Sequence, residues 1–157
     1  MKVIVPGSYD PVTLGHLELI RRAAEKYDEI YAVVFINPEK KYMFSIEERV
    51  EMLRLALGDM QNVTVDFSLG YVVDYMKEHG IEKIFKGYRN DSDYAYEMVQ
   101  AEYNFSHGGY ETELFKTSSD LSLISSTRAR ELILEGGELS SLLPPAVTEY
   151  LKDKKLN

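Results

Sequence analysis

The sequence predicts an α/β protein built on a mainly parallel, five-stranded sheet. Short apolar runs rich in β-branched residues alternate along the chain with amphipathic helical patterns, which is typical of βαβ units. The chain has 157 residues, of which 45% are apolar and 28% charged, so its size and composition fit one globular domain. We therefore expect a single domain over residues 1–157.

Each predicted strand is a short apolar run that ends at polar or turn-forming residues. The five runs are Val3–Val5, Ile30–Ile36, Val63–Phe67, Ile81–Phe85 and the shorter Glu113–Lys116. Crossovers between parallel strands are right-handed, and ligands bind beyond the carboxyl ends of such strands, where the strand order reverses. The prediction is a doubly wound, Rossmann-like sheet whose functional loops follow strands one, two, four and five.

The predicted helices have apolar positions three and four residues apart and recognisable end signals. Ser45 and Glu48 form a capping box before the second helix, and glycines such as Gly80 end helices. The predicted helices are Leu17–Tyr27, Ile46–Leu57, Tyr71–His79, Asp93–Phe105, a segment from Ser125 or Ser126 to Gly136, and Pro145–Lys152, the last within a C-terminal helical region of about 144–154 with a frayed tail.

Composition and charge exclude several classes of function. The formal net charge is −8, which disfavours a broad surface for nucleic acid or anionic membrane but allows a local basic pocket. The chain has no cysteine, which excludes disulfides, thiol nucleophiles and thiolate metal sites. No apolar run is long enough for a signal peptide or a transmembrane helix. We expect a cytoplasmic protein with no nucleic-acid or membrane partner.

The stretch "GSYDPVTLGH", residues 7–16, joins the first strand to the first helix. Gly7 allows backbone to approach a ligand closely, and Gly15 allows close packing at the helix start. Unpaired N–H groups and the helix dipole favour an anion there, and His16 falls in the first helical turn. The stretch lacks the features of a P-loop or of GxGxxG. An ordinary strand-to-helix loop with an exposed histidine is the alternative.

Three other loops at the same end of the sheet carry cations or a helix start. Lys40 and Lys41 follow the second strand, Lys86 and Arg89 follow the fourth, and "ISST" follows the fifth. Each has a simple alternative, because loop lysines are usually solvated, Arg89 could pair with Asp91, and serine often caps a helix. Their convergence in an acidic protein favours a site that binds phosphate groups.

The same residues resemble a known family. "GSYDPVTLGH" is similar to the (T/S)xxH motif of the nucleotidyltransferase α/β-phosphodiesterase superfamily, and "ISSTRAR" is similar to its second signature. Within it, "PGSYDPVTLGH", "KKYMFSIEERVEML" and "KGYRNDSDYAYEMVQA" resemble three blocks of the bacterial phosphopantetheine adenylyltransferases. The resemblance runs along nearly the whole chain. It implies an enzyme of coenzyme A biosynthesis that moves AMP from ATP to 4′-phosphopantetheine, giving dephospho-coenzyme A and pyrophosphate.

The resemblance also implies residue roles. The catalytic residues would be His16, Lys40 and Arg89, and the acceptor would be bound by Ser8, Lys40, Val72 and Lys86. The implied ATP contacts are Gly7, Ser8, Tyr9, Gly15, His16, Gly87, Tyr88, Arg89, Glu97, Leu121, Ser122, Leu123, Ile124, Ser125, Ser126 and Thr127.

The implied chemistry needs no dedicated metal site. A phosphate monoester is already nucleophilic near neutral pH, so the protein has to position the reactants and neutralise charge. The sequence shows no carboxylate cluster at ligand spacing, so we expect Mg²⁺ to arrive with ATP. Family membership further implies a homohexamer, with coenzyme A as a feedback ligand.

Two departures from the family pattern keep other acceptors open. Lys86 stands where the family has arginine, and Thr127 with Arg130 makes "ISSTRAR" closer to the pyridine-nucleotide adenylyltransferases. The alternatives are a nicotinate- or nicotinamide-mononucleotide adenylyltransferase, a cytidylyltransferase of the same superfamily, a non-catalytic nucleotide-binding domain, or a domain that binds another phosphorylated molecule.

Overall fold

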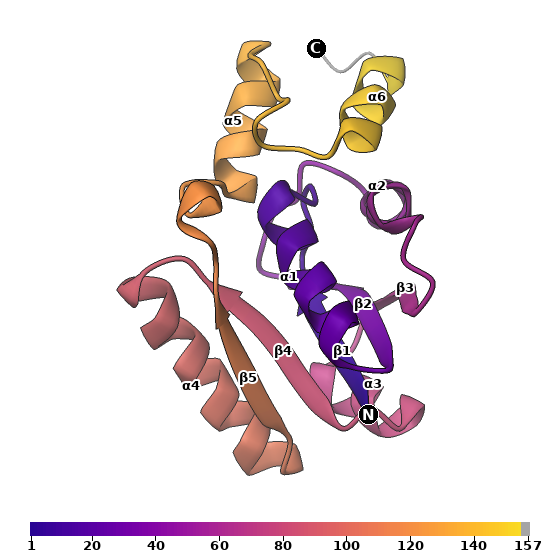
Figure 1. The fold of residues 1–157 in the computed structure, drawn as a ribbon, viewed down its shortest axis with the longest axis vertical. Helices are drawn as coiled ribbons and strands as arrows, with labels where there is room; N and C mark the ends of the chain where they lie inside the picture. The colour runs from indigo at the N-terminus through magenta and orange to yellow at the C-terminus, as the bar shows by residue number, and fades with distance from the viewer. Residues whose placement is uncertain (155–157) are drawn as a thin grey trace.

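A computed structural model of the chain describes residues 1–154. Its single sheet has five parallel strands in the order β3-β2-β1-β4-β5 (Figure 1). The strands are β1 (Lys2–Gly7), β2 (Glu29–Phe35), β3 (Val63–Ser68), β4 (Lys83–Tyr88) and β5 (Glu111–Lys116). The strand order reverses between β1 and β4, as in a Rossmann-like sheet. The predicted fold class is confirmed.

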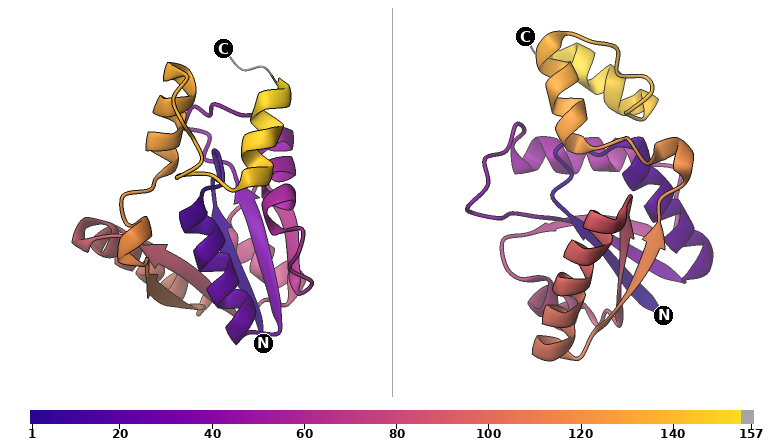
Figure 2. Two further views of the ribbon diagram at one scale, coloured as in Figure 1. Left: turned by 45° about the horizontal axis from the view of Figure 1, so that its top comes forward. Right: turned by 90° about the vertical axis from the view of Figure 1, so that its left-hand side faces the viewer.

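Within residues 1–154, six α-helices and one 3₁₀ turn connect and flank the strands. They are α1 (Leu14–Lys26), α2 (Ile46–Leu57), α3 (Val72–His79), α4 (Asp91–Gly108), η1 (Ser119–Leu121), α5 (Ser126–Glu135) and α6 (Pro145–Lys154). Figure 1 and the turned views in Figure 2 show α5 and α6 together at one end of the molecule, with α6 beside α2. The predicted frayed tail lies outside the described residues.

The central strands of the sheet are buried on both faces because their side chains alternate between two apolar clusters. In β1, Val3 and Val5 pack into the larger cluster together with α1, α2, α5 and α6. Ile4, between them, faces the smaller cluster, which includes Tyr75 and Met76 of α3. This alternation is what a central strand covered by helices on both sides requires.

Several elements differ in their ends from the sequence prediction. Helix α1 begins at Leu14 rather than Leu17, because Thr13 is its N-cap. Helix α4 begins at Asp91 rather than Asp93, because Asn90 accepts the N–H of Asp93 at 2.9 Å.

The difference that matters most for the site is in β4. It runs from Lys83 to Tyr88 rather than over Ile81–Phe85, because Lys86, Gly87 and Tyr88 continue the ladder with β5. Lys86 therefore lies within the strand, and Arg89 directly follows it.

A helix that crosses a lipid bilayer needs about 20 mostly apolar residues. No helix within residues 1–154 combines the length and apolar character that a membrane crossing needs.

Candidate active site

A cavity of about 600 Å³ opens at the carboxyl ends of β1, β2, β4 and β5. It lies where the strand order reverses, which is where ligands bind in sheets of this type. The cavity brings together most of the site residues predicted from the sequence: Gly7, Ser8, Tyr9, Gly15, His16, Lys40, Val72, Lys86, Gly87, Arg89, Glu97, Ile124, Ser125, Ser126 and Thr127. The four loops identified from the sequence thus converge on one site.

Four predicted ATP contacts do not line this cavity. The ring of Tyr88 packs edge-on against Tyr94, with their centroids 4.9 Å apart. Leu121 ends the 3₁₀ turn η1, Ser122 follows it, and Leu123 is 89% exposed. The geometry therefore gives these four residues no contact with the cavity.

The β1–α1 loop has a backbone that its sequence did not reveal. Tyr9 has a φ of 49°, in the left-handed region that bulky residues rarely adopt. Its ring is buried, and its hydroxyl donates to the carbonyl of Val5 at 2.7 Å. A Cβ at Gly7 would lie 3.1 Å from the Tyr9 ring, so the glycine makes room for this buried side chain.

His16 is half-buried at the start of α1, and its protonation is set by its neighbours. Its Nδ1 accepts the backbone N–H of Thr13 at 3.0 Å, so the neutral ring carries its proton on Nε2. Burial lowers the pKa of His16 to about 4, and the positive charges of Lys86 and Arg89 act in the same direction. At neutral pH the side chain is an uncharged hydrogen-bond donor, and the alternative of a solvent-exposed loop histidine is wrong.

The two predicted cations at the end of β4, Lys86 within the strand and Arg89 just after it, each contact an acidic side chain of α4. Nζ of Lys86 lies 3.4 Å from Oε1 of Glu97. Nε of Arg89 lies 2.9 Å from Oδ2 of Asp93, which also accepts the Arg89 backbone N–H. The acidic neighbour of Arg89 is therefore Asp93, and not Asp91 as the simple alternative supposed. Lys40 is exposed on the β2–α2 loop and lines the same cavity.

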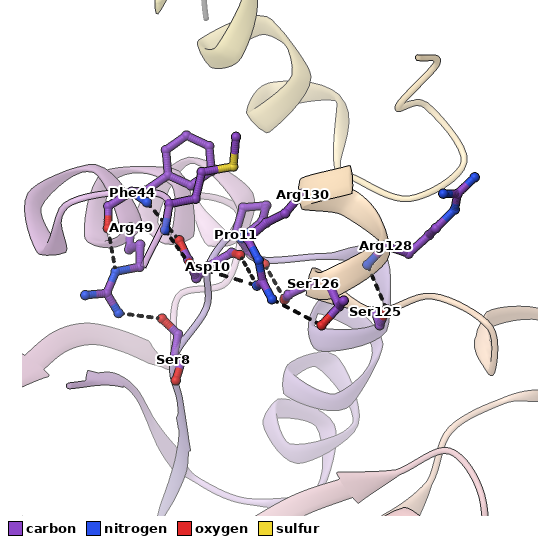
Figure 3. Close-up of polar contacts among 11 residues, drawn as sticks. Ser8, Asp10, Pro11, Phe44, Arg49, Ser125, Ser126, Arg128 and Arg130 are labelled. Atoms are coloured by element: carbon purple, nitrogen blue, oxygen red, sulfur yellow. Dashed lines mark hydrogen bonds and ion pairs between the residues drawn. The ribbon is translucent and has the colours of Figure 1, made fainter. Parts of the chain in front are cut away.

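The start of α5 is joined to the β1–α1 loop by hydrogen bonds (Figure 3). Ser125 is the N-cap, accepting the N–H of Arg128 at 3.0 Å, so of the two predicted caps Ser125 is the one used. The hydroxyl of Ser126 donates to the carbonyl of Pro11 at 2.8 Å. Nη1 of Arg130 donates to the carbonyl of Asp10 at 2.8 Å.

Sequence reasoning did not assign several polar residues that line the cavity. Asp10, Asn37, Asp93, Gln100, Asn104 and Arg130 belong to this group. Asp10 and Asp93 lie inside motifs noted from the sequence, so their motif positions were an available signal. Gln100 and Asn104 lie four residues apart on α4, and that spacing indicates a shared helix face.

Within residues 1–154, no three His, Asp or Glu side chains are grouped so that they could hold a metal ion.

Comparison with known proteins identifies the family. Residues 4–132 match the cytidylyltransferase-like family model. The phosphopantetheine adenylyltransferase of Streptomyces coelicolor is 40% identical over 99% of this chain and 98% of its own length. That of Corynebacterium diphtheriae is 41% identical over 98% of this chain and 97% of its own length. The chain belongs to the phosphopantetheine adenylyltransferase family. As a member of this family it is a nucleotidyltransferase. These relatives do not support the alternatives of another acceptor or of a non-catalytic domain better than they support phosphopantetheine adenylyl transfer.

Proposed function

We propose that the chain transfers AMP from ATP to 4′-phosphopantetheine, forming dephospho-coenzyme A and pyrophosphate. The observation that supports this most strongly is the convergence of four post-strand loops on one cavity lined by His16, Lys40, Lys86 and Arg89. Cations and backbone amides gathered in one cleft suit two phosphorylated substrates. The relatives named phosphopantetheine adenylyltransferase supply the identity of the acceptor.

The reaction is an in-line displacement at the α-phosphorus of ATP. An oxygen of the acceptor phosphate forms the new bond to phosphorus, while the bond from that phosphorus to the bridging oxygen breaks and pyrophosphate leaves. The acceptor phosphate has a second pKa near 6, so no general base is needed. Catalysis then consists of holding the two reactants in line and of stabilising charge on the oxygens.

The cavity residues have suitable chemistry for these tasks. Neutral His16 can donate a hydrogen bond from its Nε2–H to a phosphate oxygen without first taking up a proton. Lys40 and Arg89 can neutralise charge on the α- and β-phosphates, and Lys86 can bind the acceptor phosphate. A phosphate at Lys86 would compete with Glu97, which now lies 3.4 Å from its ammonium.

We also propose that Mg²⁺ enters with ATP, held mainly by phosphate oxygens and water. We propose a cytoplasmic location as well, and feedback binding of coenzyme A in the acceptor site, as the family resemblance implies. We propose a homohexamer because the family resemblance implies one. Self-association is supported by α4, which has no buried residue along its 18 positions and exposes Val99, Tyr103 and Phe105. An uncovered apolar face of this kind is typical of a subunit interface, and light scattering would measure the assembly.

The proposed reaction is tested by offering the purified protein ATP or CTP with each candidate acceptor. We expect pyrophosphate release and a dephospho-coenzyme A mass only with ATP, Mg²⁺ and 4′-phosphopantetheine. Nicotinate and nicotinamide mononucleotides are the matched acceptors for the pyridine-nucleotide alternative. Faster turnover with either of them would contradict the proposed acceptor, and no turnover with any acceptor would contradict the enzymatic function.

A further inference from the structure

Arg49 of α2 is a buried cation outside the cavity. Its side chain is almost fully buried, at 2% exposure, and it does not line the cavity. Among the described residues, its guanidinium donates to two backbone carbonyls rather than to a carboxylate: Nε to Phe44 at 3.2 Å and Nη1 to Ser8 at 3.0 Å (Figure 3). Burial lowers the pKa of Arg49, which means that the buried charge is costly. The two hydrogen bonds to carbonyl oxygens and the nearby charge of Asp10 offset part of this cost.

The carbonyl of Ser8 belongs to the peptide that precedes Tyr9, the residue with left-handed backbone. In a planar trans peptide the C=O and the N–H point in opposite directions. Arg49 holds the Ser8 carbonyl from outside the cavity, and both Ser8 and Tyr9 line the cavity. The Tyr9 N–H is therefore turned away from Arg49, and it has no acceptor among residues 1–154.

Arg49 also reaches the segment that carries Lys40. Its guanidinium lies 4.0 Å from the centre of the Tyr42 ring, and the Tyr42 hydroxyl accepts the N–H of Asn37 at 2.7 Å. A reciprocal contact comes from Asp10, whose buried carboxylate accepts the N–H groups of Met43 and Phe44 at 2.9 and 3.0 Å. Arg49 and Asp10 thus connect the β1–α1 loop to the β2–α2 loop by hydrogen bonds.

We propose that Arg49 is a positioning residue for phosphate binding. Through the Ser8 carbonyl it keeps the strained Ser8–Tyr9 peptide in one orientation, with the Tyr9 N–H available to a phosphate oxygen of the ligand. A non-glycine residue at positive φ persists only where its surroundings hold it, and Arg49 together with the Tyr9 hydroxyl bond to Val5 provides that hold. The ligand class rests on the proposed function, whereas the role of Arg49 rests on the contacts of this loop.

The test compares Arg49→Met with a matched control, Asn62→Ala. Asn62 also donates to two backbone carbonyls, those of Ala24 and Tyr27, and it does not line the cavity. Both variants should melt at a lower temperature than the wild type. Calorimetric titration with pyrophosphate and Mg²⁺ should show binding at least tenfold weaker for Arg49→Met, but within twofold of wild type for Asn62→Ala. Pyrophosphate affinity within threefold of wild type for a folded Arg49→Met, or equal losses in both variants, would overturn the proposal.

A measurement on the wild type keeps the proposal testable even if Arg49→Met does not fold. Saturation with pyrophosphate should move the amide resonance of Tyr9 in a proton–nitrogen correlation spectrum, with the distant amide of Gly58 as reference. A Tyr9 amide that does not move contradicts the proposal. Pyrophosphate binds without the acceptor, so this test does not depend on the identity of the acceptor. If the predicted changes in pyrophosphate binding occur but phosphopantetheine is not adenylylated, the proposed acceptor is refuted and the role of Arg49 is not.

Discussion

Replacing His16 with alanine should remove a transition-state contact and a helix cap together. The Nε2–H of the neutral ring is the group available to the phosphates, because Nδ1 is occupied by the Thr13 N–H at 3.0 Å. A contact made mainly to charge that develops in the transition state lowers kcat more than substrate affinity when it is lost. By analogy with the deletion of one oxyanion donor, we expect kcat to fall by roughly 10²–10³, or about 2.7–4 kcal/mol.

The same substitution has a separate cost in stability. His16 and Thr13 form a capping box, so alanine leaves the Thr13 N–H without its side-chain acceptor. A lost helix cap costs about 1 kcal/mol. We therefore expect His16→Ala to fold, with a stability lower by about this amount.

Ser45→Ala separates the two effects. Ser45 and Glu48 form the capping box of α2, with bonds of 2.9 and 3.1 Å, and neither lines the cavity. Denaturant unfolding should give similar losses of stability for Ser45→Ala and His16→Ala, whereas steady-state kinetics should show the drop in kcat only for His16→Ala. A folded His16→Ala enzyme with kcat within a factor of about three of wild type would refute the catalytic role.

Three further outcomes are expected. Because its pKa is lowered to about 4, His16 stays neutral in the folded protein while the unfolded chain takes up a proton below about pH 6.5, so folding stability should fall from pH 6.5 towards pH 4. Denaturant unfolding at both pH values should show a smaller fall in His16→Ala, and an equal fall would contradict the shift. Lys86→Ala should raise KM for phosphopantetheine more than KM for ATP in steady-state kinetics. Lys86→Arg should be tolerated and could strengthen the binding of phosphopantetheine. A larger effect of Lys86→Ala on KM for ATP would place Lys86 at the ATP phosphates instead. Arg89→Ala should weaken ATP binding by about 1.5–3 kcal/mol, measured by calorimetry, and unchanged affinity would make Arg89 only a partner of Asp93.

The sheet and the approximate position of the site could be predicted because their signals are local. Alternating apolar runs define strands over a few residues, and caps such as Ser45 with Glu48 lie three positions apart. The end of β4 could not be predicted, because Lys86 and Gly87 are held in the strand by pairing with β5. Their own side chains give no strand signal, so the ladder of a neighbouring strand decided the boundary.

The hydrogen bonds that hold the β1–α1 loop in place could not be predicted for a similar reason. Arg49 reaches Ser8 across 41 positions and Arg130 reaches Asp10 across 120 positions, distances at which a sequence pattern has no information. The left-handed backbone of Tyr9 was equally hidden, because aromatic residues rarely adopt it. The sequence thus predicted most of the named residues that meet at the cavity, and only the structure shows what holds them there.

The ion pairs of the cavity relate the acidic character of the chain to its proposed substrates. A protein with a formal net charge of −8 repels polyphosphates over most of its surface. In the cavity, Glu97 and Asp93 lie beside Lys86 and Arg89 and offset part of their charge. A weakly bound anion gains little there, because it must compete with a carboxylate that is already in place. The proposed substrates bring a multiply charged group to each cation, the acceptor phosphate to Lys86 and the ATP phosphates to Arg89, and such groups can displace these contacts. The same carboxylates that weaken the binding of a single anion therefore favour the proposed pair of phosphorylated substrates.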